Sequence, residues 1–215
     1  DGSKRLIGDY REASWSPFGR FVVAASENEL TALEPDGDVR WTLARPGVRS
    51  PRWAGTEADT RIAYVDRSGL RVVAGDGSGD RLLVPGFRGQ LAWRPGTSFV
   101  LATATARDVR AIDSASGRTL WRVARTGSAP TEIAWSNNGR RLLVVARRPL
   151  LVYQRRAIVY ELGPGADPVR DAALHPAGRT LVFAQYDTVR SSIWVVPRIR
   201  LDASAARRLL AGAGT

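Results

Sequence analysis

The chain has 215 residues and carries 32 Lys and Arg against 21 Asp and Glu, so its formal net charge is +11. It contains no cysteine, which excludes disulfide bonds and thiolate chemistry. Its apolar runs are far shorter than the roughly 20 residues that a membrane-spanning helix needs.

Five apolar runs each close on a bulky residue and then break into a turn rich in Pro or Gly. These anchor residues follow one another at intervals of 38, 40, 42 and 39 residues, at Trp15, Trp53, Trp93, Trp135 and Leu174. A period of about 40–45 residues with several short strands per unit is typical of a β-propeller blade. We therefore expect one all-β propeller domain over 1–215, with four-stranded antiparallel blades at about 11–48, 49–88, 89–130, 131–169 and 170–215.

Each repeat reads as four short strands. The first strand ends at the anchor residue, and the second strands are expected at 21–25, 62–65, 99–102, 142–146 and 181–184. Third strands are expected at 30–33, 70–74, 109–112, 150–153 and 193–196, and fourth strands at 39–43, 81–84, 119–123, 157–162 and 207–210. The dipeptides Asp36-Gly37, Asp76-Gly77 and Ser116-Gly117 favour tight hairpins between third and fourth strands.

The anchor residues predict how neighbouring blades pack. Side chains two positions apart share one face of a strand, so the anchor and the residue two before it should face the same neighbour. The residue just before the anchor is small in four repeats, which lets the other neighbour approach closely, and Arg52 breaks this rule. Trp93 and Trp135 are accordingly expected to be buried between blades.

The two ends of the chain both resemble fourth strands. Residues 1–10 read as the outer strand of a preceding blade, and 207–210 would complete the fifth. Since two outer strands do not complete one blade, we expect the chain to come from a longer propeller of roughly six to eight blades.

The anchor turns resemble a known repeat. Trp15-Ser16-Pro17-Phe18-Gly19-Arg20 and the apolar strand after it are similar to the WD-like repeat of TolB-type propellers, and the resemblance covers essentially the whole chain. The sequence departs from this repeat pattern at Asn137 and Leu174. The resemblance implies a non-enzymatic protein- or peptide-binding module of a larger bacterial protein, exported or membrane-anchored, in the periplasm or outside the cell.

Two other functions remain open. One is an accessory propeller that gates a hydrolase or peptidase, as the propellers preceding some peptidase domains do. The other is binding to nucleic acid or another polyanion, because the chain is strongly basic. Against the latter, Arg20, Arg140 and Arg179 recur at equivalent turn positions and do not gather in one segment, so nucleic acid is not the expected partner.

No catalytic or cofactor pattern is visible in the sequence. The chain has no Gly-x-Ser-x-Gly elbow, and its single histidine, His175, lies in an anchor turn where other repeats have Ser or Arg. Residues 111–121 resemble the repeat of quinone-cofactor (PQQ-type) propellers, with a weaker copy at 33–41, but no calcium or cofactor ligands accompany them. We expect no enzyme activity, no cofactor and no metal.

One register offers a candidate binding site. Charged and polar residues stand three and four positions before the anchors, where the first strands begin. The side chains at these positions should surround one opening of the propeller channel. There they would either bind a ligand or form ion pairs and hydrogen bonds with one another. The candidate mouth residues are Arg11, Glu12, Arg49, Gln90, Glu132, Arg170 and Asp171.

Overall fold

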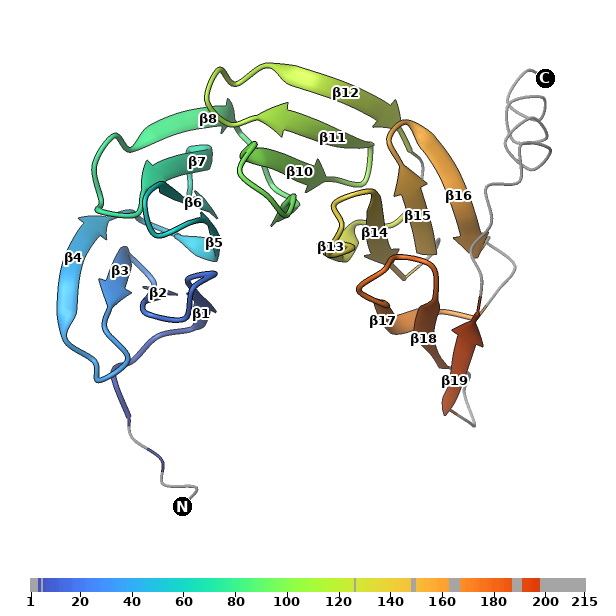
Figure 1. The fold of residues 1–215 in the computed structure, drawn as a ribbon, viewed down its shortest axis with the longest axis horizontal. Coiled ribbons are helices and arrows are strands. Elements are labelled where there is room, and N and C mark those ends of the chain that lie inside the picture. Colours follow the sequence, from blue (N-terminus) through green and yellow to red (C-terminus); the bar gives the residue numbers. More distant parts are fainter. Residues whose placement is uncertain are drawn as a thin grey trace. The chain divides into compact units, whose positions relative to one another are not determined.

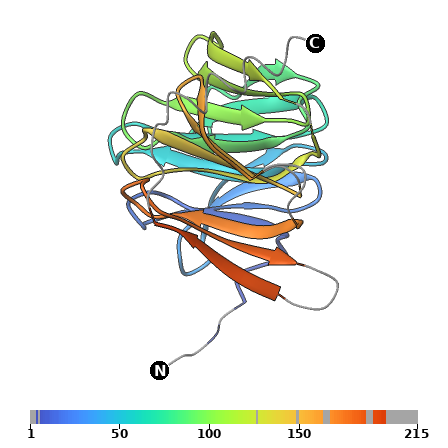
Figure 2. The ribbon, with the colours of Figure 1, turned by 90° about the vertical axis from the view of Figure 1, so that its right-hand side faces the viewer.

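The computed structural model describes residues 4, 6–125, 127–147, 150–162, 167–186 and 191–197. Over these residues it contains nineteen β-strands, no helix, and five antiparallel sheets in which strands adjacent in sequence pair (Figures 1 and 2). The chain divides into two compact units. Unit 1 comprises Asp1–Arg88, Gly96–Phe99 and Ser114–Gly117, and unit 2 comprises Gly89–Pro95, Val100–Asp113 and Arg118–Thr215.

Unit 1 contains two four-stranded sheets. The first has the order β1 (Glu12–Trp15), β2 (Val22–Ala25), β3 (Glu29–Leu33) and β4 (Val39–Ala44). The second has the order β5 (Arg49–Gly55), β6 (Thr60–Val65), β7 (Gly69–Ala74) and β8 (Arg81–Pro85).

Unit 2 contains the other three sheets. Two are four-stranded: β9 (Gln90–Trp93), β10 (Val100–Ala104), β11 (Asp108–Asp113) and β12 (Thr119–Ala124), then β13 (Pro130–Trp135), β14 (Arg141–Ala146), β15 (Leu150–Gln154) and β16 (Ala157–Leu162). The last consists of β17 (Val169–Leu174), β18 (Leu181–Tyr186) and β19 (Ser191–Val196). The fourth strand expected at 207–210 lies outside the described residues.

The sheets follow the expected repeats closely. Every described second, third and fourth strand lies within about two residues of its predicted bounds. Residues 6–10 form no strand, and residues 1–3 and 5 of the outer strand expected over 1–10 lie outside the described residues, so that strand stays a prediction. Ile7 and Tyr10 pack by their side chains against Val22, Ala24 and Leu33 of the first sheet.

Three anchors pack against the sheet that precedes them in sequence. Within unit 1, Trp53 lies in one core cluster with Val23, Ala25 and Leu30 of the first sheet. Within unit 2, Trp135 packs with residues of the third sheet and its Nε1 donates to the Ala92 carbonyl at 3.3 Å. Leu174 likewise packs on the fourth sheet.

The predicted face of the first strands is confirmed in the fourth and fifth sheets. Ile133 and Ala172, two positions before their anchors, lie in the same core clusters as Trp135 and Leu174. Burial is less complete than expected, since Trp93 and Trp135 are both half-buried. The Arg94 guanidinium lies 5.9 Å from the centroid of the Trp135 ring, at the edge of the packed interface. Trp15, in the first sheet, is 57% exposed.

The residue after the anchor closes the turn. Ser16 is buried, and its Oγ accepts a hydrogen bond from Phe21 N at 3.0 Å while its carbonyl accepts from Gly19 N at 2.9 Å. Ser136 makes the same two contacts, with Arg141 N and Gly139 N. His175 occupies this position in the fifth repeat, where its Nδ1 accepts from Ala177 N at 3.2 Å. The histidine is therefore a turn residue here.

Gly77 shows why its hairpin needs glycine. Its φ is +85°, a left-handed value that side chains disfavour. A Cβ on this residue would also approach the Trp41 ring to about 2.9 Å. Trp41 lies in the core cluster shared by the first two sheets and donates from Nε1 to Gly75 O at 2.9 Å. The weaker of the two quinone-type repeats thus supplies a packing tryptophan.

Candidate functional site

The predicted mouth residues of unit 1 lie where neighbouring first strands begin. Strands β1 and β5 are in contact, and Glu12 Oε2 accepts a hydrogen bond from Ser50 N at 2.9 Å. Arg49 begins β5 next to Ser50 and is half-buried. Arg11 points to a different partner, forming an exposed ion pair with Glu27 at 3.1 Å.

In unit 2 the predicted residues occupy the same register of β9, β13 and β17. Gln90 is half-buried, whereas Glu132, Arg170 and Asp171 are exposed. Strand β13 contacts both β9 and β17, so these positions lie on adjacent first strands. A single ring that joins the residues of both units stays a prediction.

Irregular backbone marks this register in three sheets. The pairing shifts between Arg49 and Arg52, between Pro130 and Glu132, and between Val169 and Asp171. Ser50 sits in the first of these bulges with φ of +53°. A bulge bends the strand and redirects its side chains, so the mouth residues do not follow simple alternation.

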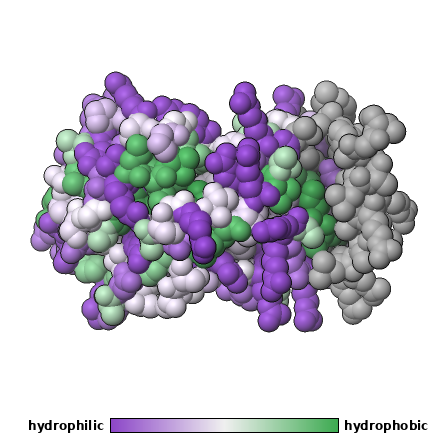
Figure 3. Space-filling view, turned by 90° about the horizontal axis from the view of Figure 1, so that it is seen from above, coloured by the Kyte–Doolittle hydropathy of each residue, from purple (hydrophilic) through white to green (hydrophobic). Residues whose placement is uncertain are grey.

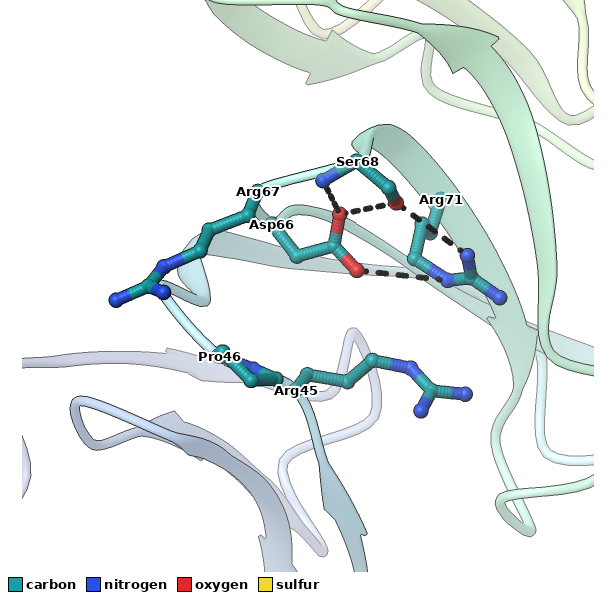
Figure 4. A pocket seen from close by; sticks show the side chains of 6 residues that line it. All are labelled: Arg45, Pro46, Asp66, Arg67, Ser68 and Arg71. Atoms are coloured by element: carbon teal, nitrogen blue, oxygen red, sulfur yellow. Dashed lines mark hydrogen bonds and ion pairs between the residues drawn. The ribbon is translucent and has the colours of Figure 1, made fainter.

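A second site lies at the turn between β6 and β7 and was not predicted from the sequence. An open pocket of about 350 Å³ is lined by Arg45, Pro46, Asp66, Arg67, Ser68 and Arg71, which we call the arginine pocket (Figure 4). Arg45 and Pro46 belong to the segment that follows β4, and Arg71 belongs to β7. All of its residues lie in unit 1.

Asp66 organises the turn that lines the pocket. Its Oδ1 accepts hydrogen bonds from Ser68 N at 2.7 Å, Ser68 Oγ at 2.5 Å and Gly69 N at 3.0 Å. Its Oδ2 lies 3.8 Å from Arg71 Nε. Arg88 donates to the carbonyls of Asp66 and Arg67 and covers the back of the turn. These contacts fix the turn and present the Arg67 side chain outward (Figure 4).

Below the turn, Asp80 joins two of the arginines. Its carboxylate pairs with Arg45, and with Arg71 Nη2 at 2.7 Å, while Tyr64 Oη donates to it at 2.6 Å. The Asp80 side chain is only 8% exposed. Burial would raise the pKa of this carboxyl, but hydrogen bonds from Arg71, Tyr64 and Arg45 outweigh burial and hold the pKa below its ordinary value. Asp80 is therefore ionised and fixes both guanidinium groups.

The arginine pocket keeps an excess of positive charge. Four guanidinium groups, those of Arg45, Arg67, Arg71 and Arg88, stand against the carboxylates of Asp66 and Asp80. The exposed Arg67 guanidinium makes no hydrogen bond or ion pair with any residue that the structure describes. Planar guanidinium groups match the geometry of carboxylates, so the pocket can take an anionic group.

Unit 2 repeats the motif of a buried carboxylate between two arginines. Asp108 Oδ2 lies 2.7 Å from both Arg110 Nη2 and Arg122 Nε, and the Asp108 side chain is 3% exposed. Burial opposes its ionisation, but the Arg110 and Arg122 contacts dominate and lower its pKa. The recurrence of arginine at the third position of the third strand, Arg71 and Arg110, is the sequence signal for these sites.

Comparison with known proteins identifies the fold. No protein-family model matches the chain, and no curated protein matches it. Among solved structures, 1046 chains are similar. One is the β-propeller domain of Cps50 (Swd1) from Myceliophteria thermophila, with a TM-score of 0.68 and 14% sequence identity over 85% of this chain and 68% of that chain.

The chain has a β-propeller fold. Each sheet is thus one blade, and the predicted all-β propeller repeat is confirmed. The closer resemblance to TolB-type propellers stays an expectation from the anchor turns. So many similar structures share this fold that it does not by itself point to one function.

No group of three or more His, Asp or Glu side chains among the described residues could hold a metal ion. Likewise, the described part of the chain contains no helix long and apolar enough to cross a membrane.

Proposed function

We propose that this propeller is a non-enzymatic protein-binding module and that its arginine pocket takes an acidic segment of a partner protein. The observation that carries the proposal is the unpaired Arg67 guanidinium beside Arg45 and Arg71, whose positions are fixed by Asp80. A preformed pocket spares the ligand the cost of ordering these side chains. A larger exported or membrane-anchored bacterial protein, in the periplasm or outside the cell, is the proposed setting, supported by the resemblance to TolB-type propellers.

Binding of labelled peptides tests the proposal. A fluorescein-labelled peptide rich in glutamate should bind the full chain, and a glutamine peptide of equal length should not. Arg67→Glu should weaken binding of the acidic peptide about tenfold, because it replaces an attractive charge by a repulsive one at the pocket. The exposed Arg140, in a turn of unit 2, provides the matched control, and Arg140→Glu should leave affinity within about twofold.

The competing functions give different results in this experiment. If the chain binds polyanions generally, single-stranded DNA should bind with a steep salt dependence, and both charge reversals should weaken it equally. Equal binding of the glutamine peptide, or no effect of Arg67→Glu, would overturn the assignment of the arginine pocket.

A further inference from the structure

A second pocket lies at the other end of β6. It has a volume of about 290 Å³ and is lined by three aromatic rings, Phe18, Phe21 and Trp53, together with Glu57, Asp59 and Asp76. Arg40, Ala58, Thr60, Ala74 and Gly75 complete its lining, and we call it the aromatic pocket. Thr60 begins β6 at this pocket, whereas Asp66 of the arginine pocket follows the last residue of β6. The two pockets are therefore about 20 Å apart along the strand.

The three rings form one connected surface. Phe18 meets Phe21 edge to face at 5.8 Å between ring centroids, with an interplanar angle of 88°. Phe21 stacks on Trp53 at 6.1 Å with an angle of 21°. The face of an aromatic ring carries partial negative charge, so such a surface attracts cations.

The chain itself shows that this surface holds a cation. The Arg40 guanidinium carbon lies 4.3 Å from the Phe21 centroid. Arg40 also pairs with Glu34 at 2.8 Å, which holds it on one side of the ring. A guanidinium group is thus compatible with these rings.

The rim of the aromatic pocket is acidic although the chain is basic. Glu57, Asp59 and Asp76 contribute three negative charges against the single positive charge of Arg40. Glu57 has only a loose, exposed contact with Arg20 at 3.5 Å, and Asp59 lies 3.8 Å from Arg61. Such exposed contacts are weak, so they leave most of the negative potential in place.

Asp76 is the best placed of the three carboxylates. Its Oδ1 accepts hydrogen bonds from Ser78 N at 2.9 Å and from Ser78 Oγ at 2.7 Å. The hydrogen bond from the Ser78 hydroxyl, followed by that from its backbone amide, lowers the pKa of Asp76 and keeps it ionised. Its orientation is fixed by the hairpin between β7 and β8.

Trp53 adds an independent observation. It is 7% exposed, and its buried Nε1 has no hydrogen-bond partner among the residues that the structure describes. The equivalent Trp135 donates its Nε1 to a backbone carbonyl of the preceding blade. Leaving a buried N–H unpaired is costly, so Trp53 would gain from any rearrangement that brings an acceptor to its Nε1.

We propose that the aromatic pocket binds a basic side chain, a lysine ammonium or an arginine guanidinium, from a peptide segment of a partner. The cation lies against the aromatic surface and is neutralised by Asp76, Glu57 and Asp59. This site is separate from the arginine pocket and has the opposite charge preference.

Chemical shift changes in the full chain test this proposal with small probes. N-acetyl-lysine methyl ester and N-acetyl-arginine methyl ester should shift the indole N–H signal of Trp53 and the amide of Gly75. The norleucine analogue has a similar apolar stem without the charge, and it should bind at least about fivefold more weakly. N-acetyl-glutamate dimethyl ester and free N-acetyl-glutamate should leave both signals unchanged.

Two carboxylate variants provide a matched pair. Asp76→Asn keeps the acceptor for the turn but removes the charge, so the fold survives and affinity for the lysine probe should fall about fivefold. Asp36→Asn is the control, because Asp36 occupies a similar turn, where it accepts from Asp38 N at 3.2 Å outside the aromatic pocket.

Three results would overturn the proposal. They are equal binding of the norleucine analogue, equal effects of the two Asn variants, and the absence of any shift at Trp53 and Gly75. The glutamate peptide experiment is unaffected by these outcomes, so failure here is distinguishable from failure of the proposed function.

Discussion

Two buried tyrosine hydroxyls differ in what surrounds them. Tyr64 Oη donates to Asp80 and accepts from Arg45 Nε at 3.1 Å and Arg71 Nε at 3.2 Å. Tyr153 is 1% exposed, and its hydroxyl has no partner among the described residues. Tyr64→Phe should lower the free energy of unfolding by about 1–3 kcal/mol, whereas Tyr153→Phe should be neutral or stabilising. Urea unfolding of the two variants measures the difference.

Alkaline titration supplies the control for these variants. Burial raises the pKa of both tyrosines to about 12, from an ordinary value of 10.0. A raised pKa means that folding favours the neutral form, so the contribution is complete below pH 10 and is lost as the pH rises towards 12. Each Phe variant should reduce this alkaline loss of stability. A Tyr153→Phe variant as unstable as Tyr64→Phe would contradict the difference in hydrogen bonding.

Asp80 should be the most sensitive residue of the arginine pocket. Asp80→Ala leaves the Arg45 and Arg71 guanidinium groups without their carboxylate, and we expect a loss of about 3–5 kcal/mol in the free energy of unfolding. Because the folded pKa of Asp80 lies below 3.8, its contribution is complete above that pH and is lost as the pH falls through the folded value. Acid unfolding should accordingly show a shallower pH dependence in the variant.

Glu34→Ala provides the comparison for Asp80→Ala. Glu34 pairs with Arg40 at 2.8 Å, but both side chains are at least 40% exposed. An exposed ion pair contributes about 0–1 kcal/mol, so the free energy of unfolding of this variant should be close to that of the parent chain. Equal losses in the free energy of unfolding for Asp80→Ala and Glu34→Ala, measured in urea, would show that the burial of Asp80 does not increase its contribution to stability.

The residues of the arginine pocket could not be predicted because three separate segments supply them. Arg45 follows β4, Asp66 and Arg71 flank one turn, and Asp80 precedes β8. The candidate mouth residues were easier to propose, because they recur at the same positions in each repeat, three and four residues before the anchor. A repeated residue type indicates the role of Ser16 in the turn, because a serine, Ser136, also follows the anchor in the fourth repeat. A serine after tryptophan does not by itself reveal a closed turn.

At the scale of elements, the anchors give the sharpest test of packing. Trp135 packs on the preceding blade and bonds to Ala92 O, whereas Trp15 is 57% exposed. Trp135→Ala should lower the free energy of unfolding by about 3 kcal/mol, and Trp15→Ala by less than about 1 kcal/mol. Thermal unfolding of both variants measures this contrast. A larger loss for Trp15→Ala would contradict the stabilising role of Trp135 packing on the preceding blade.

The strands were predictable because each depends on local sequence. Alternation of side chains, Asp-Gly turns and the repeated anchor all act within a few residues. The bulge at Ser50 was not predictable, because its positive φ depends on pairing with a strand that lies farther along the chain. Local signals therefore located the strands but not every irregularity within them.

For the whole molecule, the net charge of +11 is a poor guide to any one surface. The arginine pocket is basic, whereas the aromatic pocket at the other end of β6 has an acidic rim. The face shown in Figure 3 mixes hydrophilic and hydrophobic residues. The basic composition left general polyanion binding open as an alternative, whereas the arrangement of charge in unit 1 supports the two proposed pockets with opposite preferences.

The packing of Trp53, Trp135 and Leu174 on an earlier blade has a consequence for synthesis. A ribosome releases the chain from its N-terminus, so the blade that receives Trp53 is complete before Trp53 emerges, and the same order holds for Trp135 and Leu174. The second, fourth and fifth blades therefore form next to a docking surface that has already been synthesised. Translation in this direction shortens the time for which Trp53, Trp135 and Leu174 are exposed to other nascent chains.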